Sequence, residues 1–333
     1  MDRVAGLSAA ERGELFRQSA ARRGLRDAII EKDFWVCWVL KKLFTDDNLK
    51  SRLVFKGGTS LSKVYKLIDR FSEDVDLILD WQLLGYGSEG DDPLRPLASK
   101  NQQDRFNKHM NERAAEHIRG PLLAQLSAAF ASIAEITVAV DGRDPHCIDV
   151  GYPAAFKADY LLPTVRLEIG PLGAWVPSSL HSIQAYASED YPDVFRDPFC
   201  PVVAIAAERT FWEKATILHK EAHRAGAIPS RHSRHYYDLF KLANSAVRVS
   251  ALGDRKLLQD VVAFKNRFYP SGWARYDLAV PGTFRLLPKK QHIADLEKDY
   301  RTMSGMLFGD IPSFAAIIDG LAALETEINE LKK

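Results

Sequence analysis

Hydrophobic positions along the front of the chain recur with two periods, one helical and one typical of strands. Apolar residues at helical spacing predict a helix over about 28–44, whereas short apolar runs at 53–55 and 75–79 are typical of strands. Between those runs, helical spacing predicts a helix over 60–68. Further strands are expected over 135–140, 146–151, 155–162, 164–169 and 181–187, helices over 101–117 and 120–134, and a loop over 84–99. This pattern favours an α/β domain.

The pattern changes near residue 195, where Pro192, Pro198 and Pro201 interrupt any regular element. From 202 onward helical spacing dominates, with helices expected over 203–225, 233–246, 253–266 and 311–331 and an irregular stretch over 267–290. We therefore expect a first domain over 1–195 and a mainly helical C-terminal domain over 196–333.

The composition does not point to a particular class of binding partner. The chain has 333 residues, 46% of them hydrophobic, and its 45 basic and 44 acidic residues give a net charge of +1, so a polyanion must be held by local basic patches. No apolar stretch approaches the roughly 20 residues of a membrane span, and no signal peptide is visible. The cysteines, Cys37, Cys147 and Cys200, are too few and too scattered for a disulfide scaffold or a zinc site. We expect a soluble, cytoplasmic protein with reduced, buried thiols and no membrane contact.

The segment Gly57-Gly58-Thr59-Ser60 has the features of a phosphate site. It follows a predicted strand and opens a predicted helix. Paired glycines can adopt positive φ and let the backbone approach a ligand, while a helix N-terminus offers unpaired N–H groups to an anion. Thr59 or Ser60 would add a hydroxyl donor, and Lys63 lies within reach on the same helix. The segment therefore predicts nucleotide-binding residues at Gly57, Gly58, Thr59, Ser60 and Lys63.

The next strand carries Asp74 and Asp76, whose alternate positions point both carboxylates to one side. Such a pair repels unless a cation lies between them, and beside a phosphate that cation is Mg²⁺. A lone Gly-Gly is usually a turn, and a lone Asp-x-Asp is more often a solvated strand face. Their order along the chain is far more specific. It predicts that Asp74 and Asp76 bind Mg²⁺ and are catalytic in a nucleotidyltransferase that uses an NTP.

These motifs resemble those of the DNA polymerase β-like nucleotidyltransferases. More narrowly, the chain resembles the AbiEii/AbiGii toxin family of type IV toxin–antitoxin systems. The matching elements are IEKDFWV at 30–36, KGGTSLSK at 56–63, SEDVDL at 72–77, Glu208, Glu213-Lys214-Ala215, RHYYDL at 234–239, Asp299-Tyr300 and Met306-Leu307-Phe308-Gly309. Of these elements, only the Gly-Gly-Thr-Ser and Asp-x-Asp motifs together are specific enough to indicate a function without the others. The resemblance implies a polymerase β-like domain with a mixed sheet, followed by the helical domain.

Three further residues are candidates for the site. Glu168 alternates with Leu167 in a predicted strand and is the best third metal ligand, although it fits an ordinary solvent-facing glutamate as well. The resemblance makes Lys214 a catalytic contact to the triphosphate, where the plain alternative is a solvated lysine. It also makes Asp238 catalytic, where the alternative is a structural i,i+4 pair with Arg234.

The resemblance implies transfer of a nucleoside monophosphate to RNA, at the tRNA 3′ acceptor stem, which would block translation and growth. A genetically linked antitoxin would be the partner, without necessarily touching the toxin. Basic residues crowd 220–235, and aromatic residues that could stack bases, though such residues more often form core, are Tyr236, Tyr237, Phe268, Tyr269 and Trp273. The alternatives are transfer to a protein hydroxyl or a small molecule, and a nucleotide-binding module without catalysis.

Overall fold

The computed structural model describes residues 1–87, 92–157 and 161–331, which belong to two compact units. Unit 1 contains Met1–Val64 and Ser72–Ile205, and unit 2 contains Tyr65–Phe71 and Ala206–Lys333. The division after Ile205 differs from the one expected at 195, because the strand that ends at Ile205 belongs to the sheet of unit 1.

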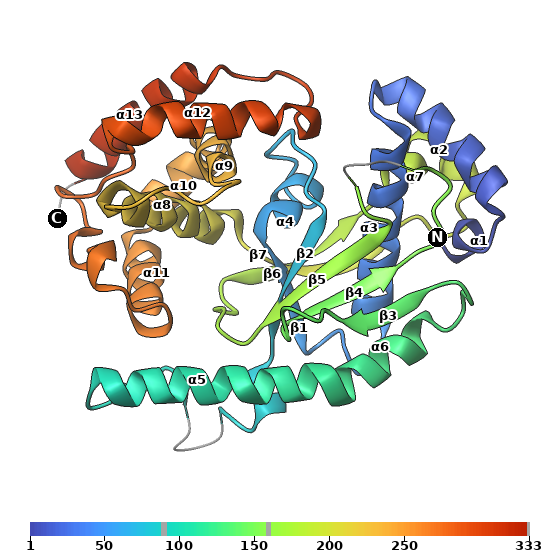
Figure 1. Ribbon diagram of the computed structural model, residues 1–333, viewed down its shortest axis with the longest axis horizontal. Coiled ribbons are helices and arrows are strands. Elements are labelled where there is room, and N and C mark those ends of the chain that lie inside the picture. The colour runs from blue at the N-terminus through green and yellow to red at the C-terminus, as the bar shows by residue number, and fades with distance from the viewer. Residues whose placement is uncertain (88–91, 158–160, 332–333) are drawn as a thin grey trace. The chain divides into compact units, whose positions relative to one another are not determined.

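The described residues of unit 1 form a mixed sheet of seven strands in the order β3-β4-β5-β2-β1-β7-β6 (Figure 1). The strands are β1 (Leu53–Lys56), β2 (Asp74–Leu79), β3 (Thr137–Val140), β4 (Cys147–Gly151), β5 (Thr164–Gly170), β6 (Ser178–Ile183) and β7 (Cys200–Ile205). β1 runs antiparallel to β2 and parallel to β7, whereas β2 runs parallel to β5. The expected α/β fold with a mixed sheet is therefore confirmed.

Several expected elements differ from the structure. The strand expected over 181–187 is β6, which ends at Ile183, and a helix, α7 (Tyr186–Asp190), begins within the expected range. The helix expected over 60–68 is α4 (Gly57–Lys63), which begins and ends earlier. The strand expected over 155–162 is not formed at 155–157 or 161–162, and 158–160 lie outside the described residues. The helix expected over 203–225 begins only at Ala207, because the residues before it form β7.

One face of the sheet is packed into the main core, as strand alternation requires. Phe55 on β1 and Val75 and Leu77 on β2 are fully buried there. The helix α3 (Asp27–Thr45) contributes Trp35 and Trp38, both fully buried in the same cluster. Because α3 is apolar around most of its circumference, burial rather than amphipathicity fixes its position against the strands.

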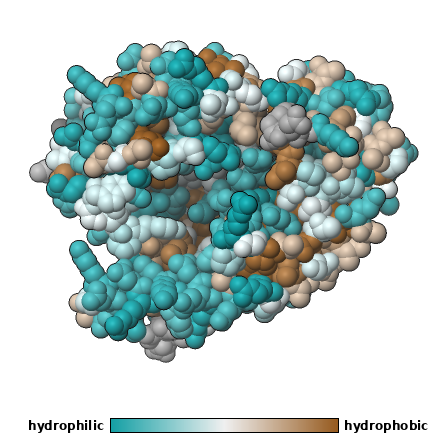
Figure 2. Space-filling view, viewed as in Figure 1, coloured by the Kyte–Doolittle hydropathy of each residue, from teal (hydrophilic) through white to brown (hydrophobic). Residues whose placement is uncertain are grey.

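The other helices of unit 1 are α1 (Asp2–Ala5), α2 (Ala9–Arg23), α4 (Gly57–Lys63), α5 (Lys100–His117), α6 (Leu123–Phe130) and α7 (Tyr186–Asp190). α2 begins at a complete capping box, in which Ser8 accepts from the Glu11 backbone and the Glu11 carboxylate accepts from Ser8. The polar residues of α5 give its visible surface a hydrophilic character (Figure 2).

Unit 2 is mainly helical, as expected for the C-terminal domain (Figure 1). Its longer helices in the described residues are α8 (Ala207–His223), α9 (Ser233–Ala243), α10 (Val247–Gly253), α11 (Arg255–Phe268), α12 (Ile293–Thr302) and α13 (Phe314–Glu330). Trp212, Tyr236 and Tyr237 are fully buried in this unit. Within the described ranges, no helix combines the length and apolar character needed to cross a membrane.

Candidate active site

The turn between β1 and α4 brings the two principal sequence motifs into contact. β1 ends at Lys56, and α4 begins at Gly57, whose φ is +82°. A Cβ atom at Gly57 would lie 1.9 Å from the Asp76 Oδ2 atom. Both the left-handed backbone and the nearby carboxylate therefore require glycine at this position. The Gly-Gly turn and the Asp-x-Asp strand form one local structure, as their order in the sequence predicted.

The two hydroxyl groups of the turn hold it in place. Thr59 Oγ1 donates to the backbone carbonyl of Asp74, and Ser60 Oγ donates to the carbonyl of Gly57 at 2.9 Å. Both residues are buried. Their hydroxyl hydrogens already have backbone acceptors, so direct donation to a phosphate stays a prediction.

Charged residues form a row across three adjacent strands on the face opposite the main core. Asp74 and Asp76 are half-buried and alternate with the buried Val75. Lys56 on β1 lies opposite Asp76 in the antiparallel pair, and Glu168 on β5 lies beside Asp76 in the parallel pair. Residues in register point to the same face of a sheet. The strands therefore place Lys56, Asp76 and Glu168 side by side.

Lys56 was not among the expected site residues, although the sequence contains a signal for it. It precedes Gly57 directly and alternates with Phe55, which faces the core. A charged residue at the end of a buried strand, on the face that carries the Asp-x-Asp pair, belongs to the same group of candidates. The register of β1 against β2, which places Lys56 opposite Asp76, identifies Lys56 as a candidate site residue.

The donor chemistry of this face fits a divalent cation. Asp74 and Asp76 present carboxylate oxygens, and Mg²⁺ is usually held by one or two carboxylates together with substrate phosphates and water. Within the described residues, no three His, Cys, Asp or Glu side chains are grouped closely enough to hold a metal by themselves. Because Mg²⁺ usually keeps water and substrate phosphates among its ligands, the two carboxylates fit a site that the substrate completes. Glu168 as a third ligand stays a prediction.

Lys63, expected to bind nucleotide, has a partner within unit 1. Its Nζ atom lies 2.7 Å from Asp33 Oδ1 and 3.9 Å from the ring centroid of Tyr186, whose backbone N–H donates to Asp33 Oδ2. Burial opposes the lysine charge, but the carboxylate of Asp33 raises the pKa of Lys63. The ion pair anchors α4 to α3. Because the Lys63 ammonium already has a carboxylate partner, its contact with a phosphate stays a prediction.

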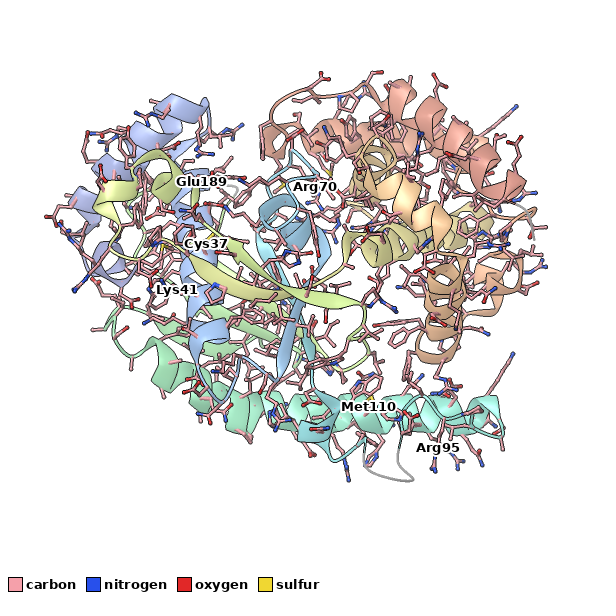
Figure 3. All side chains as sticks on the ribbon, turned by 180° about the vertical axis from the view of Figure 1, so that it is seen from behind. Cys37, Lys41, Arg70, Arg95, Met110 and Glu189 are labelled. Carbon is pink, nitrogen blue, oxygen red and sulfur yellow. The ribbon has the colours of Figure 1, made fainter. Side chains whose placement is uncertain are left out.

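Burial disfavours the charged form of a side chain, so it lowers the pKa of a lysine but raises the pKa of a thiol such as that of Cys37. Cys37 lies on α3 one turn after Asp33 (Figure 3). Its burial raises the pKa of the thiol well above its ordinary value. Cys147 and Cys200 are likewise free and buried, as expected from their spacing.

Lys214 and Asp238, which were predicted separately, meet in unit 2. Lys214 Nζ lies 2.8 Å from Asp238 Oδ2, and Arg70 (Figure 3) contacts both oxygens of the same carboxylate, at 2.7 and 2.9 Å. Burial alone would raise the pKa of Asp238, but the two cations hold it far below its ordinary range. In the described part of unit 2, the ion pairs of Asp238 come from Arg70 and Lys214, not from Arg234 as the i,i+4 alternative proposed.

The environment of Lys214 is unusual for a lysine. Burial lowers its pKa, and the neighbouring Arg70 opposes the effect of Asp238. Its Nζ atom also lies 3.1 Å from His235 Nδ1, and desolvation keeps the pKa of that histidine well below its ordinary value. The neutral ring can therefore accept a hydrogen bond from the ammonium. Perturbed groups gathered in this way are typical of functional sites.

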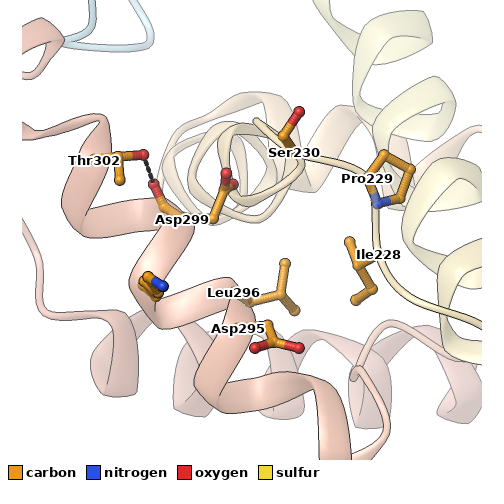
Figure 4. A pocket seen from close by; sticks show the side chains of 8 residues that line it. Ile228, Pro229, Ser230, Asp295, Leu296, Asp299 and Thr302 are labelled. Atoms are coloured by element: carbon orange, nitrogen blue, oxygen red, sulfur yellow. Dashed lines mark hydrogen bonds between the residues drawn. The ribbon is translucent and has the colours of Figure 1, made fainter.

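A pocket of about 400 Å³ lies elsewhere in unit 2, between α12 and the segment before α9 (Figure 4). It is lined by Ile228, Pro229, Ser230, Asp295, Leu296, Lys298, Asp299 and Thr302. Asp299 accepts from the backbone N–H groups of Arg231 and Ser233 and so fixes the start of α9. None of the predicted nucleotide, metal or catalytic residues lines this pocket.

The match to one protein family agrees with the motifs. The family described as nucleotidyl transferase AbiEii toxin of type IV toxin–antitoxin systems matches residues 38–320. No curated protein matches the chain. Among solved structures, the nucleotidyltransferase toxin MenT4 of Mycobacterium tuberculosis is 18% identical over 96% of this chain and 99% of its own, with a TM-score of 0.46. JHP933 of Helicobacter pylori is 15% identical over 92% and 94%, with a TM-score of 0.43.

Proposed function

The chain belongs to the AbiEii family of nucleotidyl transferase toxins of type IV toxin–antitoxin systems, and from this premise we propose that its acceptor is RNA. The toxin would move a nucleoside monophosphate from an NTP to the 3′ end of a tRNA acceptor stem and thereby block translation and growth. The single observation that carries the reaction is the direct packing of Asp76 against the Gly57 turn. It places a carboxylate for a cation against a backbone suited to phosphate.

The transfer forms one bond and breaks one. An acceptor hydroxyl oxygen attacks the α-phosphorus of the NTP, the bond from that phosphorus to the β-phosphate oxygen breaks, and pyrophosphate leaves. The proton of the acceptor hydroxyl is lost to a base or to water. Positioning and charge stabilisation are what a protein mainly contributes to such a reaction.

Asp74 and Asp76 would hold Mg²⁺, with Glu168 beside Asp76 as a third ligand. When bound, Mg²⁺ would supply positive charge to the phosphate oxygens on which negative charge develops. The backbone of Gly57 and Gly58 would bind the terminal phosphates. Lys56, in register with Asp76, would add an ammonium group to the same phosphates, and Lys63 on α4 would be a further nucleotide-binding residue.

In unit 2, Lys214 would contact the triphosphate, and Asp238 would hold the lysine in place. What supports these roles is the ion cluster itself. Asp238 is fully buried and takes both Arg70 and Lys214 as partners. The ion pair with a buried carboxylate fixes the position of the Lys214 ammonium. Asp238 would thus act through Lys214, as a positioning residue.

The acceptor could instead be a protein hydroxyl or a small molecule, which the nearly neutral net charge of +1 allows. A module that only binds nucleotides would not need Asp74 and Asp76 on one face. The antitoxin that a type IV system implies is the expected cellular partner. It need not contact the toxin.

A labelling experiment tests the acceptor. The protein is incubated with total tRNA, Mg²⁺ and each NTP in turn, labelled either at the α-phosphate or at the γ-phosphate. The proposal predicts that the α-label appears on RNA with one or more NTPs and that the γ-label never does, because it leaves with pyrophosphate. An α-label on protein or on a small molecule alone would overturn the RNA assignment, and transfer of the γ-label would indicate a different reaction.

A further inference from the structure

The structure separates the aromatic residues near the basic segment into two groups. Tyr236, Tyr237 and Phe268 are buried in the core of unit 2. Tyr269 and Trp273 are instead 43% and 41% exposed. They are four residues apart in the chain, so their Cα atoms lie within about 15 Å of each other. Two large aromatic side chains are therefore exposed within one short segment of unit 2.

Each exposed ring is accompanied by cations. Lys220 Nζ lies 5.0 Å from the ring centroid of Trp273, and Arg224 Cζ lies 4.6 Å from it. Lys220 lies in the last turn of α8, and Arg224 follows the end of that helix directly. Trp273 is still 41% exposed, so part of its surface is left uncovered. Lys265 Nζ lies 5.0 Å from the ring centroid of Tyr269.

The segment that carries Trp273 is held firmly to α8. The fully buried His219 donates from Nε2 to the carbonyl of Arg275 at 2.9 Å and accepts at Nδ1 from the backbone N–H of Arg285 at 3.0 Å. Burial lowers the pKa of His219 to about 4, so the ring is neutral and can both donate and accept. Ala274, next to Trp273, is fully buried. The indole is therefore exposed on a fixed support.

The surroundings of this surface are positively charged. Besides desolvation, Arg285, Arg275 and Lys289 all lower the pKa of His223, at the end of α8. Of the nearby acids, Asp277 is paired with Arg275, and the buried Glu221 is paired with Arg224. Positive charge beside exposed aromatic rings matches a polyanion that also carries flat bases.

We infer that the surface formed by Lys220, Arg224, Lys265, Tyr269 and Trp273, here called the Trp273 surface, binds unpaired nucleotides of the RNA acceptor. A base stacks on the exposed part of Trp273, and Lys220 and Lys265, which lie beside the two exposed rings, bind the backbone phosphates. Stacking tolerates any base, so the surface holds single-stranded RNA without reading its sequence. This inference rests on the proposed function, since it assigns a surface to the proposed acceptor.

Fluorescence anisotropy with a labelled single-stranded RNA of about twelve nucleotides tests the inference directly. Trp273→Ala should weaken RNA binding by about tenfold or more, as loss of a base–aromatic stack does, whereas Trp273→Phe should retain most of the affinity. Tyr269→Ala should weaken it as well. The matched control is Phe199→Ala in unit 1, which removes an aromatic side chain that is 56% exposed. NTP binding should be unchanged in all four variants.

Three outcomes contradict the inference. If Trp273→Ala and Tyr269→Ala bind RNA as tightly as Phe199→Ala does, the surface is not the RNA site. If they lose a protein partner but not RNA, the surface belongs to that protein. If the wild type binds the NTP and transfers the α-label but has no affinity for RNA, both the inference and the RNA acceptor fail, while the nucleotidyltransferase activity stands. Melting temperatures of all variants, with Trp273→Phe as the conservative change, show whether a loss reflects unfolding.

Discussion

At the scale of single residues, the strongest constraint in the site is the space at Gly57. The residue has a positive φ, and its α-carbon faces the carboxylate of Asp76. A paired glycine suggests a turn in any sequence. Here the structure adds a specific reason for the glycine, because a side chain would occupy the place of a carboxylate oxygen. The backbone conformation and the position of Asp76 are therefore linked.

Gly57→Ala should lower the nucleotidyl-transfer rate by at least about tenfold and destabilise the protein by about 1–2 kcal/mol, the cost of a left-handed backbone for an L-residue. The loss of rate follows from displacement of Asp76. The measurements are transfer of α-label from the NTP and urea unfolding. Gly142→Ala is the control, since a Cβ there meets nothing within 4 Å and the φ of Gly142 is not in the left-handed range. A wild-type rate in Gly57→Ala would show that Asp76 tolerates displacement.

The ion-pair partners of two other residues could not be predicted from the sequence. Lys63 follows the Gly-Gly turn and looked available for a phosphate, but its partner Asp33 lies 30 positions earlier. Asp238 has Arg234 one helical turn away, yet Arg70, 168 positions earlier, takes that place. Local spacing predicts neighbours within one helix. It carries no information about partners that only the tertiary fold brings together.

At the scale of elements, the register of β1, β2 and β5 extends the site beyond its motifs. The order of motifs predicted Asp74 and Asp76 on one strand face, and the strand at 164–169 was expected to carry Glu168. The pairing places Glu168 beside Asp76 and adds Lys56 on the other side. The alternation of each strand was readable, whereas the alignment between strands was not, because register depends on contacts distant in sequence.

Lys56→Gln should raise the KM for the NTP by about tenfold with a smaller effect on kcat, because the ammonium would bind phosphates in both the ground state and the transition state. Steady-state kinetics with varied NTP measures this. Lys50→Gln, at an exposed surface ion pair of the same unit, should leave KM unchanged. An unchanged KM in Lys56→Gln would remove Lys56 from the phosphate site.

β7 shows why one element was missed. Cys200–Ile205 is a short apolar run that leads almost directly into α8, with Ala206 between them. A buried strand beside a parallel neighbour lacks polar alternation, so its pattern merges with that of the following helix. The predicted helix therefore started too early, and the predicted domain boundary fell before the strand.

The contact of His219 with two backbone segments predicts a pH dependence of stability. Burial lowers the pKa of folded His219 to about 4, below the ordinary value of 6.5, so the unfolded chain binds more protons between these values. The free energy of unfolding should therefore fall as the pH drops from 6.5 toward 4, and the fall should be smaller in His219→Gln. Urea unfolding of both proteins across this range measures the difference. Parallel curves would mean that His219 does not titrate as described.

At the scale of the whole molecule, the family match spans residues from both compact units, and unit 2 includes a short segment from the front of the chain. The sequence predicted the α/β part, the helical part and the family, because periodicity and motif order are properties of contiguous segments. It could not predict that 65–71 belong with the C-terminal helices. That assignment depends on long-range contacts such as the pair between Arg70 and Asp238.

The near-neutral charge of the molecule conceals local differences. A net charge of +1 gave no indication of nucleic-acid binding, yet lysine and arginine side chains accompany the exposed rings of Tyr269 and Trp273. Net charge describes the average field, whereas recognition depends on the charge at one surface. Aromatic residues that looked equivalent in the sequence were distinguished only by their exposure.

Catalysis of nucleotidyl transfer by the carboxylates beside the Gly57 turn is the proposal on which the other residue roles depend. Its most direct test is the rate at which α-label moves from the NTP to the acceptor in Asp76→Asn, which keeps the shape of the side chain and removes its charge. The rate should fall by at least about a hundredfold, with unfolding free energy close to wild type, while the surface variant Asp47→Asn should match wild type. An Asp76→Asn protein that transfers label at the wild-type rate would contradict the account.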